Sequence, residues 1–263
     1  MRIALHADGD VGKRTGRILL AEADLTALGM YGHRMGAADR RTMSISSLDG
    51  FDPLVTDAPD AKSFAAIAAD EGLSCVVAGS PRIDRRLARR FLDRGLTLVV
   101  GAGLAGGIAE VLAAHEMAAT DRETSVRIGW TAPGRPLRRG EAIPFPDPVG
   151  PRWAERIGRA PRRRRRSGGG PVVTRYEAPI TGEWAGAVVR VAGERGGRRV
   201  EQVVGVADQG AHLAAIALAA GALAVAEGAY PPGVHRPAVA AEAYLGAALR
   251  IGLGVATHTV ETG

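Results

Sequence analysis

Short apolar runs alternate with helical patterns along the first half of the chain, and this alternation restricts the possible folds more than any other feature. The apolar runs predict strands, and most of them are separated by a predicted helix. The strands are expected at residues 3–7, 25–31, 54–56, 75–78 and 96–100, and the helices at 12–23, 63–70, 83–93 and 106–119. Strands that alternate with helices favour a parallel sheet with right-handed crossovers. We therefore expect an α/β fold in this half.

The pattern changes in the second half. Strand-like signals run from residue 171 to 206, and Gly196-Gly197 between two valine-rich segments is a good hairpin signal. Asp208 stands at a helix N-cap position, and the Ala- and Leu-rich helix after it is expected to reach about Glu227. These signals predict a second domain of mixed α and β structure.

The expected domain boundaries follow from this change. The parallel-sheet domain is expected to comprise residues 1–124, completed by 235–263, and the second domain residues 125–234. Within the second domain, residues 160–170 hold Arg162–Arg166 next to three glycines. Like charges repel and glycine opposes order, so we expect a solvated, flexible loop there, with a phosphate-binding patch as the alternative.

The charge balance is basic, with a formal net charge of +6. A basic balance can indicate a nucleic-acid partner. Neither interleaved aromatic residues nor a nucleic-acid-binding motif accompanies the arginine run, so nucleic acid is not expected as a partner. The two lysines, Lys13 and Lys62, are the only candidates for any mechanism that needs a catalytic lysine.

Cys75 is the only cysteine, so an intramolecular disulfide is excluded. It lies in an apolar run and is expected to be a buried core thiol. The sequence shows no signal-peptide pattern and no apolar run of the roughly 18–20 residues that span a bilayer. We therefore expect a cytoplasmic protein with no membrane partner.

The first expected strand leads into the turn Ala7-Asp8-Gly9-Asp10-Val11-Gly12, which opens a helix. The turn nearly fits the G-x-G-x-x-G fingerprint of dinucleotide-binding βαβ units, with Ala7 in place of the first glycine. Gly9 would let the backbone approach a diphosphate, and Gly12 would let the helix pack close to the strand. A helix N-terminus also favours an anion. Residues 7–12 are therefore predicted to bind a nicotinamide dinucleotide. A tight turn without a ligand is the alternative, since Asp8 and Asp10 place negative charge there.

The end of the second expected strand bears on the choice of cofactor. NAD-preferring sites usually carry an acidic residue at this place. This chain has Tyr31-Gly32-His33-Arg34 instead, and Arg34, with His33, can meet a 2′-phosphate. We expect NADP or NAD as the cofactor and favour NADP. Arg40 and Arg41 compete for the phosphate contact, and a solvent-exposed arginine is the remaining alternative.

Two more glycine turns follow expected strands, where ligands of open α/β sheets bind. They are Gly79-Ser80-Pro81 and the glycine-dense stretch that begins Gly101-Ala102-Gly103. Glycine lets the backbone approach a ligand without a side chain in the way. We therefore expect the cofactor to contact Gly79, Ser80, Gly101, Ala102 and Gly103. Helix capping and close packing are the alternative for the second stretch.

These residues resemble the homoserine dehydrogenase-like and saccharopine dehydrogenase-like Rossmann oxidoreductases, with dihydrodipicolinate reductase as a more distant relative of the same architecture. The likeness rests on residues 7–12, 77–80, 99–104 and 208–234. It implies an α/β fold with a Rossmann-type parallel sheet and a second α+β domain that carries an open, mostly antiparallel sheet. Such a sheet often mediates dimerisation, so a homodimer is expected.

The chain departs from these families at the substrate. Homoserine dehydrogenases use a lysine there, and no lysine follows Lys62; the His-His and Lys signature of dihydrodipicolinate reductases is also absent. Asp208 and His212 are the expected catalytic residues, because a helix would bring them to one side and histidine titrates near neutral pH. A helix cap followed by a partly buried histidine is the alternative. Glu110 and His115 are further candidates.

The sequence thus predicts an NAD(P)-dependent oxidoreductase that transfers a hydride to or from a small carbonyl or imine substrate of amino-acid type. The alternative is a catalytically silent dinucleotide-binding sensor or dimeric scaffold. The glycine turns favour the enzyme, and the missing family residues favour the silent protein.

Overall fold

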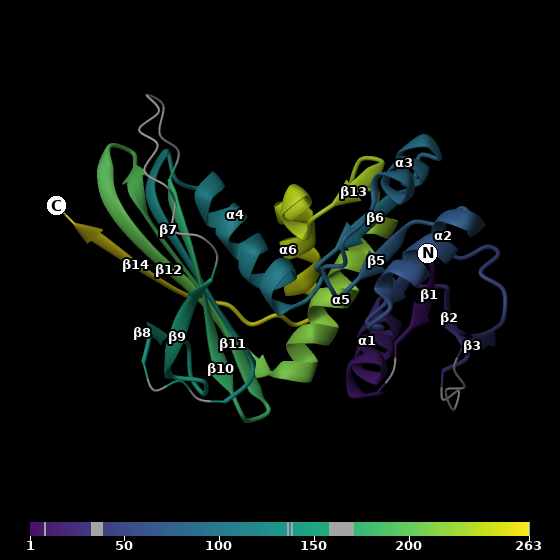
Figure 1. Ribbon diagram of the computed structural model, residues 1–263, viewed down its shortest axis with the longest axis horizontal. Helices are drawn as coiled ribbons and strands as arrows, with labels where there is room; N and C mark the ends of the chain where they lie inside the picture. The colour runs from purple at the N-terminus through teal and green to yellow at the C-terminus, as the bar shows by residue number, and fades with distance from the viewer. Residues whose placement is uncertain (8, 33–38, 136, 138, 158–170, 263) are drawn as a thin grey trace. The chain divides into compact units, whose positions relative to one another are not determined.

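The computed structural model describes residues 1–7, 9–32, 39–135, 137, 139–157 and 171–262. The chain forms two compact units (Figure 1): unit 1 comprises Met1–Gly107 and Ala211–Leu253, and unit 2 comprises Ile108–Gly210 and Gly254–Gly263. The sequence placed these divisions at 124/125 and 234/235 instead. Asp8, Arg34 and the run Arg162–Arg166 lie outside the described residues.

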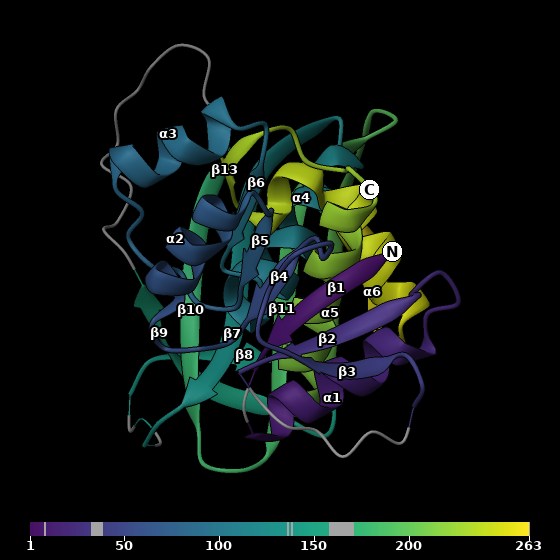
Figure 2. The same ribbon diagram turned by 90° about the vertical axis from the view of Figure 1, so that its right-hand side faces the viewer.

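Unit 1 is built on a seven-stranded sheet in the order β3-β2-β1-β4-β5-β6-β13, visible in Figure 2. Every pair of neighbouring strands in it is parallel. This order confirms the expected Rossmann-type sheet. The strands are β1 Arg2–His6, β2 Ala27–Tyr31, β3 Thr42–Ile45, β4 Leu54–Thr56, β5 Cys75–Val77, β6 Thr97–Val100 and β13 Gly233–His235.

Helices pack on both faces of this sheet. α2, Ala61–Glu71, and α3, Arg85–Asp93, cover the face that carries Cys75 and Val77. Gly221 of α5, Gly210–Ala226, lies against Val76 on the opposite face. Successive side chains of a strand point to opposite faces, so a strand buried on both sides is apolar throughout. The other helical segments of unit 1 are α1 Gly9–Ala21, η2 Pro237–Ala240 and α6 Ala241–Arg250.

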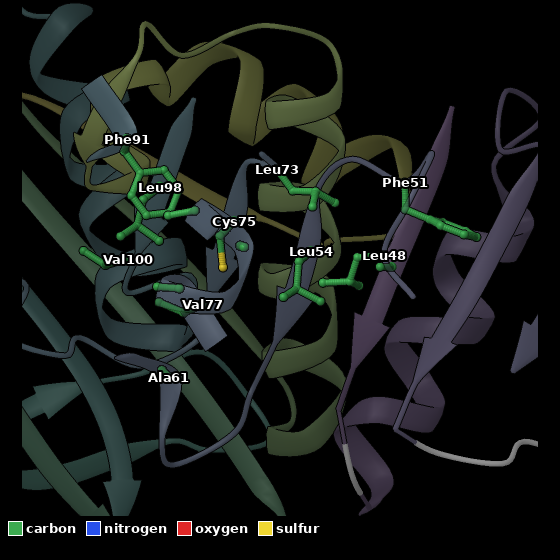
Figure 3. Close-up of a cluster of buried hydrophobic side chains, with 14 of the residues drawn as sticks. Leu48, Phe51, Leu54, Ala61, Leu73, Cys75, Val77, Phe91, Leu98 and Val100 are labelled. Carbon is green, nitrogen blue, oxygen red and sulfur yellow. The ribbon is translucent and has the colours of Figure 1, made fainter. Parts of the chain in front are cut away.

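A buried cluster joins the sheet to α2 and α3 (Figure 3). Phe91 of α3 and Leu98 of β6 are fully buried in it. Alanines at buried positions of α2 let that helix approach the sheet closely. Cys75 lies in the same cluster, and burial raises the pKa of its thiol. The expected buried core cysteine is therefore confirmed.

Unit 2 carries a seven-stranded sheet in the order β14-β12-β11-β7-β10-β9-β8. Among the described pairs, β7 and β10 run in parallel and the others antiparallel, which confirms the expected mostly antiparallel sheet. The strands are β7 Arg122–Pro133, β8 Glu141–Pro144, β9 Pro151–Ile157, β10 Val172–Ile180, β11 Trp184–Arg195, β12 Arg198–Gln209 and β14 Ala256–Thr262.

β11 and β12 form the predicted hairpin, with Gly196 and Gly197 in its turn at φ of +57° and +76°. Two successive positive φ values match the twist of the flanking strands and favour glycine. α4, Glu110–Ala118, follows the π-helical turn η1, Leu104–Ala109, and contacts β7 and β11. None of the described helices is long and apolar enough to cross a membrane.

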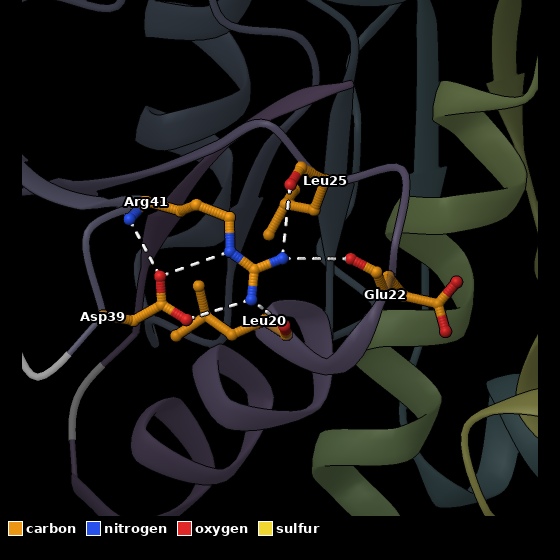
Figure 4. A network of polar contacts seen from close by, with 5 residues as sticks. All are labelled: Leu20, Glu22, Leu25, Asp39 and Arg41. Carbon is orange, nitrogen blue, oxygen red and sulfur yellow. Dashed lines mark hydrogen bonds and ion pairs between the residues drawn. The ribbon is translucent and has the colours of Figure 1, made fainter.

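The guanidinium of Arg41 ties the end of α1 to the strands that follow it (Figure 4). It donates to the backbone carbonyls of Leu20, Glu22 and Leu25, and it pairs with the Asp39 carboxylate at 2.9 Å. The last carbonyls of a helix lack helical donors, so the arginine satisfies groups that α1 leaves open. The network lies just before β2 and β3, at the edge where the parallel strands begin.

We expect this network to depend on pH. The side-chain hydrogen bond from Arg41 lowers the pKa of the Asp39 carboxyl below its ordinary value. A carboxylate with a lowered folded-state pKa contributes stability above its unfolded pKa of about 3.9, and the contribution is lost as pH falls through the folded pKa. Asp39→Asn should therefore lower the free energy of unfolding at neutral pH, with a deficit that shrinks toward pH of about 3.

Urea unfolding at both pH values measures this deficit. Exposed Asp49, changed to Asn, is the control and should show little effect at either pH. A deficit for Asp39→Asn that is the same at both pH values would contradict the role of the ionised carboxylate.

Two neighbours on α3 test the buried cluster. Phe91 is fully buried, whereas Leu92 is 58% exposed. Truncation of a buried phenylalanine leaves a cavity, so Phe91→Ala should cost about 3–5 kcal/mol of unfolding free energy. Leu92→Ala should stay within about 0.5 kcal/mol of the wild type. Equilibrium unfolding of both variants decides, and equal losses would show that the cluster is not as described.

Candidate functional site

The carboxyl ends of the strands of unit 1 meet at one edge of the sheet, because all the strands run in parallel. Ligands of open α/β sheets bind beyond this edge, where the strand order reverses. Here the order reverses at β1, which has β2 on one side and β4 on the other. Ala7 follows β1 directly, and α1 begins at Gly9, so the fold places the described residues of the predicted turn at this switch point.

Gly9 and Gly12 serve this turn in different ways. A Cβ at Gly12 would collide with the carbonyl group of Ala7, so glycine is what lets α1 pack so close to β1. Gly9 has a φ of +66°, and a Cβ there would meet no atom within 4 Å. α1 begins at Gly9, so the N–H groups of its first turn lack helical acceptors and are available to an anion. We call this open turn the first corner.

The charge of Asp10 at the first corner is partly offset within α1. Its carboxylate accepts a hydrogen bond from Arg14, one turn further along, at 2.9 Å. The carbonyl of Val11 accepts from the hydroxyl of Thr15, also at 2.9 Å. Among the described residues of the turn, the one carboxylate, that of Asp10, is therefore paired.

His6, the last residue of β1, was not singled out from the sequence. Its Nδ1 lies 2.8 Å from the carbonyl oxygen of Tyr31, and its ring stacks on Phe64 with 4.0 Å between centroids. A Cβ at Gly32 would lie 3.3 Å from Nδ1. The imidazole thus lies between the ends of β1 and β2, where Rossmann proteins recognise the adenosine ribose. A polar aromatic residue at the end of a buried strand was the signal for it.

The other predicted glycine turns meet at the ends of β5 and β6. The N–H of Gly101 donates to the carbonyls of Val77 and Gly79, at 3.1 and 2.6 Å. A Cβ at Gly79 would meet no atom within 4 Å, so space is open beside it. Ala102 is fully buried, and its side chain therefore belongs to the core. We call the end of these strands, with Gly79, Ser80 and Gly101, the second corner.

Close packing explains part of the glycine-dense stretch. A Cβ at Gly106 would lie 2.6 Å from the carbonyl oxygen of Gly101, and one at Gly107 would lie 2.5 Å from the hydroxyl of Tyr244. Gly103 is less closely packed, since a Cβ there would lie 3.2 Å from the carbonyl oxygen of Ala78. The packing role expected for this stretch is therefore confirmed at Gly106 and Gly107, and its contact with a cofactor stays a prediction.

Arg236 joins the second corner and was missed in the sequence. It follows β13, whose pairing with β6 brings it to the same edge of the sheet. Its Nη1 donates to the Ser80 hydroxyl at 2.6 Å. A Cβ at Gly101 would lie 2.7 Å from this Nη1. Arg236 and Ser80 are 156 residues apart, so no local pattern announces their contact.

The two expected catalytic residues, Asp208 and His212, lie in different secondary-structure elements. Asp208 lies in β12, and its Oδ1 accepts from the N–H of Gln209 at 2.6 Å. The prediction that Asp208 caps a helix and shares a helix face with His212 was wrong, because β12 continues to Gln209. His212 is half-buried in the first turn of α5. The two residues belong to different units.

Glu110, another candidate, is engaged in unit 2. Both of its carboxylate oxygens accept from Arg175, at 2.5 and 3.1 Å. This contact raises the pKa of Arg175, so the pair is held as an ion pair. Arg41, a candidate for the 2′-phosphate, lies at the edge of the sheet of unit 1 where the strands begin, and it donates there to carbonyls at and after the end of α1. That placement excludes it from the first corner.

Unit 2 contains a cavity of about 160 Å³ on one face of its sheet. Its charged lining residues are paired: Arg127 with Glu141, and Arg190 with Glu201. Arg127 also donates to the hydroxyl of Tyr176 at 3.2 Å. Internal ion pairs account for these charges, so the glycine corners of unit 1 form the stronger candidate site.

No protein-family model and no curated protein matches this sequence. Solved structures share its fold at low sequence identity. An amine dehydrogenase from Mycobacterium smegmatis is 14% identical, with a TM-score of 0.56 over 91% of this chain and 95% of its own. An engineered D-amino acid dehydrogenase bound to NADP+ is 14% identical, with a TM-score of 0.51 over 90% and 93%.

A UDP-N-acetylglucosamine 3-dehydrogenase from Acidithiobacillus ferrooxidans is 17% identical, with a TM-score of 0.52 over 95% of this chain and 96% of its own. None of these three is a homoserine or saccharopine dehydrogenase, so the likeness to those two families stays an expectation from the sequence. The three structures cover nearly all of the chain. The chain therefore has the two-unit α/β fold of these dehydrogenases.

Proposed function

We propose that this protein is an NAD(P)-dependent oxidoreductase that transfers a hydride to or from a small carbonyl or imine substrate of amino-acid type. The first corner carries the proposal. It combines a helix N-terminus, an open space at Gly9 and the switch point of a parallel sheet. A dinucleotide diphosphate needs these three features together. The reaction type is supported by solved structures of the same fold, which are dehydrogenases of different substrates.

For the cofactor we propose NADP over NAD. β2 ends at Tyr31 and is followed by Gly32, and neither of these described residues has the carboxylate with which NAD-preferring proteins hold the ribose. Arg34 follows two residues later in the sequence and supplies a cation for a 2′-phosphate.

We also propose a homodimer, supported by Trp153 and Trp184 of unit 2, which are 52% and 43% exposed. Aromatic residues are enriched at such interfaces.

For proton transfer we propose His212, in the first turn of α5. Imidazole titrates near neutral pH, and this suits a general acid for a carbonyl or imine.

The second candidate function is a silent dinucleotide-binding protein. The bidentate pairing of Glu110 with Arg175 favours it, because this takes one of the candidate catalytic acids out of use.

Two glycines provide a matched test of cofactor binding. Gly9 and Gly72 both have positive φ, +66° and +78°, and a Cβ at either would meet no atom within 4 Å. Gly9→Ala and Gly72→Ala should therefore cost similar stability, about 1–2 kcal/mol. Gly72 follows α2 before β5 begins, away from the first corner. We expect Gly9→Ala alone to weaken NADPH and NADH binding, by about tenfold or more.

Calorimetric titration of the wild type and both variants with NADPH and NADH gives the answer. Tighter binding of NADPH by the wild type would support the proposed preference. A wild type that binds neither nucleotide at millimolar concentration would overturn the proposed function, and equal losses in the two variants would remove Gly9 from the site.

His212→Gln should lower kcat by roughly a hundredfold or more, because general acid–base catalysis contributes that much. Cofactor affinity should not change, since the proposed role is proton transfer. NADPH oxidation with a panel of 2-oxo acids and ammonium measures kcat. His258→Gln, an exposed histidine of β14, is the control. Unchanged turnover in His212→Gln would refute the assignment, and a wild type that binds cofactor without turnover would favour the silent protein.

A further inference from the structure

Arg236 brings a positive charge to the second corner. Some arginines of unit 1 pair with carboxylates, as Arg14 does with Asp10, Arg41 with Asp39, and Arg250 with Glu22 and Glu227. Among the described residues no carboxylate pairs with Arg236, and its side-chain partner is the neutral hydroxyl of Ser80. The arginine is exposed and yet held in place by a 2.6 Å hydrogen bond.

The glycines next to Arg236 leave room for its contact with Ser80. Gly101 has a φ of +83°, and any Cβ at this position would come within 2.9 Å of both the Ser80 hydroxyl and Nη1 of Arg236. The lack of a side chain at Gly101 therefore makes room for the Arg236–Ser80 contact. Gly79 leaves open space next to the same hydroxyl-bearing residue. The carboxyl ends of β5, β6 and β13 therefore bring together the charge of Arg236, the hydroxyl of Ser80 and the open space beside Gly79.

The position of this charge along the sheet indicates what it binds. A dinucleotide bound at the switch point places its diphosphate at β1 and divides its two halves between the two sides of the sheet. β4, β5 and β6 form the side opposite β2 and β3, and this side receives the nicotinamide half. The diphosphate is already served by the first corner. The nicotinamide ring is not an anion, so the anion that remains for Arg236 belongs to the substrate.

We infer that Arg236, held by Ser80 beside Gly101, binds a carboxylate of the substrate and selects 2-oxo or imino acids over uncharged carbonyl compounds. This inference rests on the proposed function and names the substrate class for the same site. A guanidinium presents a planar fork of N–H donors that matches a carboxylate. One nitrogen of the fork bonds to Ser80, and the others remain for the ligand.

The experiment separates substrate recognition from cofactor binding. Oxalate, a small dicarboxylate, is titrated by calorimetry into the protein saturated with NADP+. The oxidised cofactor has no hydride to donate, so oxalate binds without reacting. The variants are Arg236→Gln, Arg236→Lys and, as the control, Arg89→Gln on the exposed side of α3. Arg236 is exposed and makes one side-chain hydrogen bond, so its variants should keep the melting temperature of the wild type.

We expect Arg236→Gln to weaken oxalate binding by about tenfold or more, since a hydrogen bond to a charged group contributes this much. Arg236→Lys should recover part of the affinity, because it keeps the charge but not the fork. Arg89→Gln should bind as the wild type does. NADPH affinity should be unchanged in all three variants. In turnover assays, Arg236→Gln should raise the KM for pyruvate with ammonium and leave the KM for methyl pyruvate unaltered.

Three results would overturn the inference. The first is a wild type that binds NADP+ but neither oxalate nor pyruvate. The second is an Arg236→Gln protein that binds oxalate as tightly as the wild type. The third is an equal loss of NADPH and oxalate affinity in Arg236→Gln, which would assign the arginine to the cofactor. Failure of the proposed function itself has a different signature, the absence of any nucleotide binding by the wild type.

Discussion

The close approach of Gly12 to the carbonyl of Ala7 is the contact on which the proposed site depends. It sets how near α1 lies to the end of β1, and so where the first N–H groups of the helix stand relative to the sheet. The other end of α1 is fixed by the Arg41 network, which joins one carbonyl in the last turn of the helix and two carbonyls after it to the segment before β3. A helix held at both ends can present its N-terminus to a ligand without rearranging.

Much of unit 1 could be predicted because its signals are local. Strands buried on both faces are apolar throughout, as at Leu54–Thr56 and Cys75–Val77, and they stand out in the sequence. The hairpin of β11 and β12 was equally visible, since Gly196 and Gly197 mark its turn. The strands that were not predicted are β3, β7, β8, β9, β13 and β14. Met43 of β3 and Trp153 of β9 are exposed, and such strands are defined by pairing with distant segments rather than by their own composition.

The residues of the candidate site also form two groups, those with a local signal in the sequence and those without one. Gly9, Gly12 and Gly101 could be predicted, because a backbone that must approach a ligand or a helix leaves glycine in the sequence. His6 and Arg236 could not, since each acquires its role from a residue far away in the chain, Tyr31 and Ser80. Asp208 was misassigned as a helix cap because the twelve residues of β12 extend to Gln209, one residue before α5.

The interleaving of the two units has a consequence for how the protein is made. The last strand of the parallel sheet, β13, is encoded after all the strands β7 to β12 of unit 2, and β14 adds to β12 from the C-terminal segment. Neither unit corresponds to a continuous stretch of polypeptide. During synthesis, therefore, the edge of β6 stays unpaired until β13 has emerged, and the edge of β12 stays unpaired until β14 has emerged.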